Sequence, residues 1–332
     1  MECVSFALIV DDIVLPNGET NLEALGGGGG QALFGYQLVT GQEVTVGLCA
    51  GVGPDLPQKC TVWRVPGDPC ERMYDMMDRF GPLEALPPRF QSCPNYHLGV
   101  HPQQPPLGFM QALRSAAHRN GGFLSVESYA EAEDAIRPER VLELLRRCDV
   151  FSPNDQEARS LVGPGNPEEL ALRLLSLSPP GGADVVAVPA VADTRVVDVT
   201  GCGNAFCGGF LAALYRGGRA VGKGTDPRPN NDVSGSDGGG SPAAGPPSWL
   251  GRSDLATAGA WGCVAASFMA EERGVPLTPI PQLQEAARRR LLELLPRVRA
   301  LELSLAPRAP HDDDERPDAA ASGPGNLRCS VQ

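Results

Sequence analysis

Short apolar runs alternate with amphipathic segments along most of the chain, and turns rich in glycine or polar residues separate them. Apolar runs of about four to eight residues rich in Val, Ile and Leu are typical of buried strands, whereas apolar residues spaced three and four apart indicate helices. The strands predicted in this way are 1–12, 44–50, 96–100, 123–127, 150–152 and 184–191, and the helices are 31–39, 107–119, 141–147 and a segment that begins near 154. This alternation predicts a doubly wound α/β fold with a parallel sheet.

The pattern changes after residue 221. The segment 222–248 is dominated by Gly, Pro, Ser, Asp and Asn, and such a composition cannot bury a core. Two further helices, predicted at 256–269 and 283–300, precede a second polar stretch with an acidic run. We therefore expect one domain over 1–306 with a disordered insertion at 222–248, followed by a disordered acidic tail at 307–332.

Charge and cysteine usage narrow the possible partners. The 332 residues carry a formal net charge of −12, which disfavours binding to nucleic acid or to an anionic membrane surface. The first strand has no basic segment before it, and no apolar run is long enough to span a bilayer, so we expect an intracellular, cytoplasmic protein. The ten cysteines form no Cys-x-x-Cys pair, which favours reduced thiols over zinc ligation. Lone histidines such as His97 and His101 are more often structural than functional, so neither is assigned a role.

The most distinctive local pattern lies at residues 197–210. A short β-branched run enters a turn in which one residue separates Gly201 from Gly203, and an apolar helix, 206–214, follows. The first N–H groups of such a helix lack intrahelical partners and lie at the positive end of its dipole, so the turn predicts an anion site, with phosphate as the first candidate. A tight turn without a ligand is the alternative. A dinucleotide fingerprint fits less well, because Phe206 stands where its third glycine would be.

The segment Asp198–Phe206 resembles the second signature of the pfkB/ribokinase carbohydrate-kinase family, Asp-Thr-x-Gly-Ala-Gly-Asp-x-Phe. Other segments follow the order of that family: Gly26–Gly30 resembles its early double-glycine loop, Gly53–Asp55 its Gly-x-Asp turn, Asn154–Glu157 its Asn-x-x-Glu motif and Gly262–Pro276 its late nucleotide-side helix. The resemblance implies a ribokinase-like three-layer α/β fold with a mostly parallel central sheet and a reduced lid.

The resemblance also implies roles for the residues of the turn. The backbone of Gly201, Cys202 and Gly203 would form the anion hole for the transferred phosphoryl group. Asp198 and Thr200 would belong to the cofactor site, with Asp198 close to a monovalent cation in some members of the family.

The Asn154–Glu157 motif has two possible interpretations. The resemblance implies that Asn154 and Glu157 organise a magnesium ion with water and ATP phosphates, and amide and carboxylate oxygens suit that hard cation. The residues alone equally allow a helix start, with Asn154 as the cap and Glu157 as its capping-box partner.

The substrate side of the site is expected near the N-terminus. The resemblance implies that Asp11, at the end of the first strand, hydrogen-bonds hydroxyl groups of a sugar or polyol, with Asp12 as the second choice. Gly28 and Gly29 would let the chain close over this substrate. The alternatives are that Asp11 is only solvated and that the glycine run is a flexible tether.

One residue departs from the family signature at the catalytic position. The family has an Asp at the end of the Gly-x-Gly turn, where it takes the proton of the attacking hydroxyl, but this chain has Asn204. An amide cannot act as a general base near neutral pH, and such a base supplies about 10²–10⁴-fold in rate. The usual Asn of the first signature is also absent, and the segment 158–197 is short. These features resemble a divergent fungal and algal branch related to the yeast killer-virus maintenance protein.

Two functions follow from this pattern. The first is ATP- and magnesium-dependent phosphoryl transfer to a hydroxyl of a sugar or similar small polyol, weakened by Asn204. The second is a catalytically inactive pseudokinase that keeps nucleotide or sugar binding for regulation or assembly. The sequence names neither the substrate nor the oligomeric state.

Overall fold

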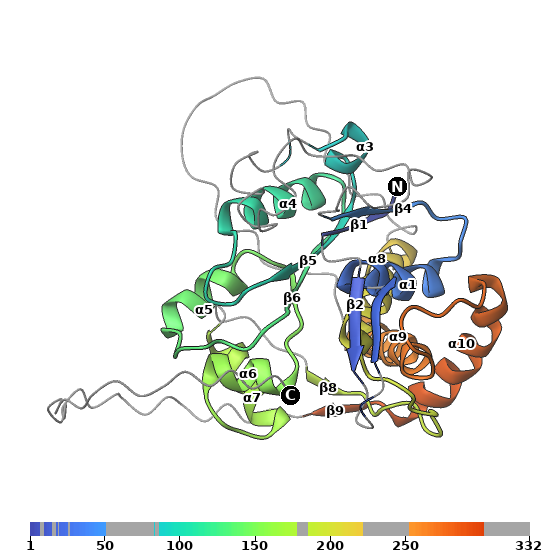
Figure 1. Cartoon of the computed structure of the whole chain (residues 1–332). Coiled ribbons are helices and arrows are strands. Elements are labelled where there is room, and N and C mark those ends of the chain that lie inside the picture. Colours follow the sequence, from blue (N-terminus) through green and yellow to red (C-terminus); the bar gives the residue numbers. More distant parts are fainter. Residues whose placement is uncertain are drawn as a thin grey trace, which may run out of the picture. The chain divides into compact units, whose positions relative to one another are not determined.

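The computed structural model describes residues 1–6, 10–14, 18, 20–25, 27–50, 83, 86–177, 185–221 and 252–301 (Figure 1). A sheet of five parallel strands lies at its centre. The strands, in spatial order, are β4 (Val46–Cys49), β1 (Cys3–Phe6), β5 (Asn95–Val100), β6 (Leu124–Ser128) and β7 (Val150–Phe151). Each overlaps a strand predicted from the sequence, and the predicted α/β fold with a parallel sheet is confirmed.

The two faces of the sheet differ in chemistry because side chains alternate along a strand. One face is apolar and packs against α4 (Leu107–Arg119) and α5 (Pro138–Leu145); it carries Val4, Phe6, Tyr96, Leu98, Val100, Leu124 and Val126. The opposite face is covered by α1 (Gly27–Thr40) and α8 (Cys202–Val221). This second face holds five buried polar residues: Ser5, Asn95, His97, Ser125 and Glu127.

Helices α1 and α8 pack with their backbones in contact. A Cβ atom at Gly208 of α8 would overlap the carbonyl oxygen of Ala32 in α1, and one at Gly35 of α1 would overlap the carbonyl oxygen of Ala205 in α8. Gly209 faces α9 (Arg252–Ala270) with similarly little space. Small residues thus set the distance between these helices, and this distance decides how closely their first turns approach the polar face of the sheet.

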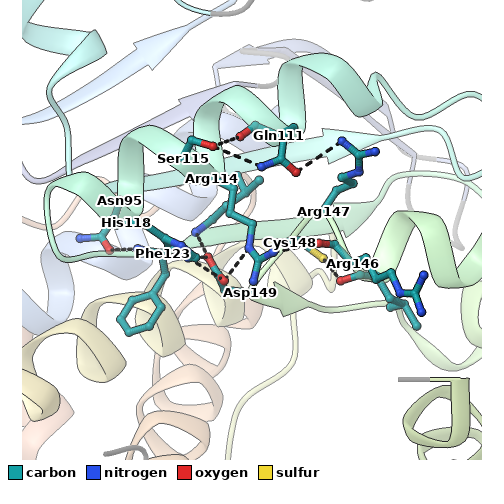
Figure 2. A network of polar contacts seen from close by, with 12 residues as sticks. Asn95, Gln111, Arg114, Ser115, His118, Phe123, Arg146, Arg147, Cys148 and Asp149 are labelled. Atoms are coloured by element: carbon teal, nitrogen blue, oxygen red, sulfur yellow. Dashed lines mark hydrogen bonds and ion pairs between the residues drawn. The ribbon is translucent and has the colours of Figure 1, made fainter. Parts of the chain in front are cut away.

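A buried carboxylate connects the other helical layer to the sheet. Asp149, just before β7, accepts hydrogen bonds from Arg114 Nε at 2.8 Å, His118 Nε2 at 2.9 Å and the backbone N–H of Leu124 at 2.9 Å (Figure 2). Burial alone would raise the pKa of the Asp149 carboxyl, but the hydrogen bonds from His118 and Leu124 and the charge of Arg114 outweigh it and hold the pKa below its ordinary value. This network joins α4 to the beginning of β6 and β7.

The remaining elements surround this arrangement. They are α3 (Pro88–Gln91), α6 (Asp155–Val162), α7 (Pro167–Leu177), α10 (Ile280–Leu294), the short 3₁₀ helix η2 (Leu295–Arg297) and two antiparallel strand pairs, β2 (Val10–Val14) with β3 (Thr20–Leu25) and β8 (Val185–Ala187) with β9 (Arg299–Leu301). Helix α10 contacts α1 and α9.

The structure corrects three sequence-based predictions. The first strand is not continuous over 1–12: β1 ends at Phe6, and Asp11 lies in β2, paired with Ala24 of β3. The strand predicted at 184–191 is the shorter β8 and pairs with β9 outside the five-stranded sheet. The helix predicted at 283–300 ends at Leu294, because Pro296 follows and removes a backbone donor.

Three sequence predictions lie outside the described residues. They are the Gly53–Asp55 turn, the disordered insertion at 222–248 and the disordered acidic tail at 307–332. Within the described part of the chain, no helix has both the length and the apolar character required to cross a membrane.

The contact between α1 and α8 predicts the effect of a single methyl group. Gly208→Ala places a Cβ against the Ala32 backbone, which cannot move aside without displacing the helix, so we expect a loss of about 2–3 kcal/mol in the free energy of unfolding. Gly108→Ala in α4 is the matched control, because no atom lies within 4 Å of its added Cβ. Urea unfolding should show little change or a small gain for Gly108→Ala. Equal effects of both substitutions would contradict the proposed close packing.

Candidate functional site

The glycine turn at the start of α8 is shaped by Asp198. Its Oδ1 accepts hydrogen bonds from the backbone N–H of Thr200 at 3.0 Å and from the Thr200 hydroxyl at 2.8 Å. Gly201 then has φ = +79°, a conformation that favours glycine, and a Cβ there would overlap the side chain of Gln31. The position of a Cβ at Gly203 is open, with no atom within 4 Å. The first turn of α8 is therefore held rigidly on one side and is accessible at Gly203.

Asn204 occupies a polar contact between α1 and the sheet. Its amide lies 3.1 Å from the carboxamide of Gln31 in α1. When the amide is oriented with its nitrogen toward Glu127 of β6, Nδ2 donates to Glu127 Oε2 at 2.9 Å. This orientation avoids an oxygen–oxygen contact with the carboxylate, and the amide oxygen accepts from Gln31 when the Gln31 carboxamide turns its nitrogen toward Asn204. The residue at the catalytic position of the family signature is thus hydrogen-bonded to a carboxylate that is remote in sequence.

Gly28 makes this contact possible from the side of α1. A Cβ at Gly28 would lie 2.8 Å from the Asn204 amide atom that faces Glu127 and 3.3 Å from Glu127 Oε1. A side chain at position 28 would therefore displace the Asn204 amide or cover the carboxylate. The sequence assigned Gly28 and Gly29 to a loop, but both lie in the first turn of α1.

Glu127 is surrounded by hydrogen-bond donors. Besides Asn204, the Cys207 thiol donates to its carboxylate at 3.9 Å, and the Glu127 residue is 8% exposed. His97 Nε2 lies 3.5 Å from the carboxylate and makes no hydrogen bond among the described residues. His97 Nδ1 lies 3.3 Å from the hydroxyl of Ser125 on the adjacent strand. Burial first, and then the charge of Glu127, raise the pKa of the Cys207 thiol, which therefore stays protonated as a donor.

The cluster of His97, Glu127 and Cys207 also has a composition found in metal sites, with its ligand atoms within 4.8 Å of one another. Because the raised pKa keeps the Cys207 thiol protonated and the thiol donates to the carboxylate, we interpret the cluster as a polar contact around Glu127. Its three members come from β5, β6 and α8, so no local spacing in the sequence could reveal it.

The Asn154–Glu157 motif begins α6 as a capping box. Asn154 Oδ1 accepts from the Glu157 N–H at 2.9 Å, and Glu157 Oε2 accepts from the Asn154 N–H at 2.8 Å. The structural interpretation of this motif is therefore confirmed, while its magnesium role stays a prediction. Burial first, and then the nearby charges of Glu127 and Glu131, raise the pKa of Glu157 to about 7. This electrostatic coupling places Glu157 near the Glu127 cluster.

The structure brings some predicted site residues together and leaves others apart. Gly28 and Asn204 contact Glu127, a residue the sequence analysis did not select, and the charge of Glu127 contributes to the raised pKa of Glu157. We expected Asp11 at the end of the first strand of the sheet. It lies instead in β2. A signal for Glu127 existed: it is the last residue of the predicted strand 123–127, and ligands of open α/β sheets bind at the carboxyl ends of strands.

The sequence matches no protein-family profile and no curated protein. Solved structures match it over nearly the whole chain. Fructokinase from Vibrio cholerae O395, in its fructose-, ADP- and calcium-bound form, superposes with a TM-score of 0.51 at 16% identity, over 89% of this chain and 99% of that chain. Aminoimidazole riboside kinase from Salmonella enterica, complexed with aminoimidazole riboside and an ATP analog, also gives 0.51 at 14% identity, over 87% and 99%. This chain has the ribokinase-like fold.

In this ribokinase-like fold, one carboxylate oxygen of Asp198 is buried without a hydrogen-bond donor among the described residues. Among the described residues, its Oδ2 makes no hydrogen bond, whereas Oδ1 is used by Thr200. A buried carboxylate oxygen without a donor is unfavourable unless a cation or water meets it. The geometry at Asp198 therefore fits a small cation next to the glycine turn.

The raised pKa of Glu157 predicts that removal of its charge increases the free energy of unfolding, and that the increase depends on pH. The folded protein binds this proton up to about pH 7, whereas an unfolded Glu loses it near 4.5, so stability falls as the pH rises between these values. Glu157→Gln keeps an acceptor for the cap and removes the charge. We expect it to raise the free energy of unfolding by about 1–3 kcal/mol at pH 8 and to change it little at pH 4.

Glu169→Gln is the matched control for this measurement. Glu169 forms the same pair of capping hydrogen bonds with Asn166, at 3.0 Å each, but it is exposed. Its substitution should shift the unfolding curve equally at both pH values. A Glu157→Gln effect that is independent of pH would contradict the assigned electrostatic cost.

Proposed function

We propose that this chain transfers the γ-phosphoryl group of ATP to a hydroxyl of a sugar or similar small polyol. The observation that carries the proposal is the joint position of the glycine turn of α8, the first turn of α1 and the buried acid of β6 in a ribokinase-like fold. Fructokinase and aminoimidazole riboside kinase, which share the fold, were solved with a sugar or riboside together with a nucleotide or its analog. Their ligands motivate the substrate class proposed here.

The first turn of α8 would hold the transferred phosphoryl group. The N–H groups of Gly201, Cys202 and Gly203 lie at or beside the start of a 20-residue helix, where the dipole favours negative charge. The open space at Gly203 leaves room for phosphate oxygens. Because phosphoryl transfer depends mainly on positioning and charge stabilisation, this turn would contribute without any covalent step.

Cations would complete the nucleotide site. Asn154 and Glu157 present amide and carboxylate oxygens, the donor types that suit Mg²⁺, and the Glu157 oxygen Oε1 takes no part in the cap. Asp198 and Thr200 would hold a monovalent cation at the unpartnered Asp198 Oδ2. When bound, these cations would neutralise charge on the phosphates, while Asp11 is proposed to contact substrate hydroxyls.

A pseudokinase is the second candidate, and Asn204 is the observation that favours it. An amide at the catalytic position cannot accept the hydroxyl proton. In that case the chain would bind nucleotide or sugar for a regulatory or assembly role. The resemblance to the divergent fungal and algal branch stays a prediction that rests on Asn204 and the glycine run.

Gly203→Ala tests the proposed function without disturbing the fold. The added methyl group meets no atom within 4 Å, so the melting temperature should change by no more than about 2 °C, but the methyl group would occupy the phosphate space. We expect Gly203→Ala to lower ATP affinity and phosphoryl transfer at least about tenfold, measured with Mg²⁺ over a panel of sugars and nucleosides.

Gly108→Ala, equally open but in α4, should leave both quantities unchanged. Saturable ATP binding without transfer to any acceptor would favour the pseudokinase. Absence of Mg-ATP binding by the unsubstituted chain would exclude phosphoryl transfer.

A further inference from the structure

We propose that Glu127 is the general base of this chain and replaces the carboxylate that is missing at residue 204. This inference rests on the proposed phosphoryl transfer and identifies the group that takes the proton. No side chain at position 204 can do so, because Asn204 is an amide.

The first argument is position. Glu127 Oε2 lies one hydrogen bond, 2.9 Å, from the Asn204 amide. A carboxylate therefore stands beside the position where the family signature has one, displaced by about the length of a side-chain contact. It reaches that place from β6, whereas the turn belongs to α8.

The second argument is access. Glu127 Oε1 faces His97 Nε2 and the Asn204 amide on one side, and the Cβ positions of Gly28 and Gly99 lie 3.3 Å and 3.8 Å from it on the other. The absence of side chains at these two positions leaves the approach to Oε1 bounded by backbone. Gly28 is also the residue that the family resemblance places next to the substrate. Because a Cβ at Gly28 would already lie 2.8 Å from the Asn204 amide, a substrate hydroxyl would reach Oε1 from the side of α1 only with a shift of that amide.

The third argument is charge. Asn204 and Cys207 donate hydrogen bonds to the carboxylate, and His97 Nε2 lies 3.5 Å from it without forming a hydrogen bond. An Asp at position 204 would instead place two carboxylates in contact, and such a pair shares a proton. The neutral Asn204 thus places a hydrogen-bond donor beside Glu127 and no second carboxylate.

The proposed step balances as follows. The acceptor hydroxyl transfers its proton to Glu127 Oε1 while its oxygen forms the new bond to the γ-phosphorus of ATP. The bond between the γ-phosphorus and the bridging oxygen of the β-phosphate breaks, and ADP leaves with that electron pair. Glu127 then releases the proton to solvent, and no oxidant or further reactant is required.

The test exchanges the two side chains. Glu127→Gln keeps the shape of the residue and removes the base, so kcat should fall about 10²–10⁴-fold while ATP affinity stays within about threefold. The double variant Glu127→Gln with Asn204→Asp restores an amide–carboxylate pair with the acid at position 204, and it should recover at least tenfold of the lost kcat. Asn204→Asp alone should not exceed the unsubstituted chain at pH 7, because the adjacent acids share a proton.

Glu131→Gln is the matched control. This exposed carboxylate contributes to the same electrostatic environment but does not contact Asn204, so kcat should change by less than about twofold. Thermal unfolding and ATP titration of each variant report whether the fold and the nucleotide site are intact.

The outcomes separate this inference from the proposed function. A loss of kcat in Glu127→Gln, together with its recovery in the double variant Glu127→Gln with Asn204→Asp, supports Glu127 as the general base. Full activity of Glu127→Gln overturns it and leaves the kinase function standing. An inactive unsubstituted chain that gains activity in the exchanged variant also overturns it, because Glu127 then fails as a base in an otherwise competent site. Inactivity of every variant overturns both.

Discussion

The close packing of α1 against α8 is the constraint on which the candidate site depends. Gly35 and Gly208 let the two backbones touch, and as a consequence the first turns of both helices reach the polar face of the sheet together. With longer side chains at these positions the helices would separate, and the contact among Gly28, Asn204 and Glu127 would be lost. The close packing of the two helices therefore determines the geometry of the candidate site.

The electrostatics of that contact explain why an amide, and not an acid, is favourable at residue 204. The site already contains two carboxyl groups near each other, Glu127 and Glu157, and the charge of Glu127 contributes to the raised pKa of Glu157. A third acid directly against Glu127 would increase this cost, whereas an amide supplies a hydrogen-bond donor and no charge. The substitution in the signature is thus compatible with a retained but relocated acid, and not only with a lost one.

Much of the fold was predictable because its signals are local. Apolar periodicity predicts four strands of the sheet, β4, β5, β6 and β7, and the helices α1 and α4. The spacing of apolar residues gives the observed bounds of α4, Leu107–Arg119. The failures have non-local causes. β8 pairs with β9, more than a hundred residues away, and the short strand β1 ends before Asp11 because the chain begins a separate antiparallel pair.

The sequence by itself determined the α/β architecture, the glycine turn before α8 and the absence of an acid at residue 204. Each of these depends on residues that are close together in the chain. It also allowed the capping box of Asn154 and Glu157, which is a contact across three residues. Only the tertiary structure decided which carboxylate stands beside Asn204. Glu127, His97 and Cys207 are distant in the chain and meet because parallel strands place alternate side chains on one face beneath α8. Local spacing cannot encode such a meeting, which depends on strand register and helix packing together.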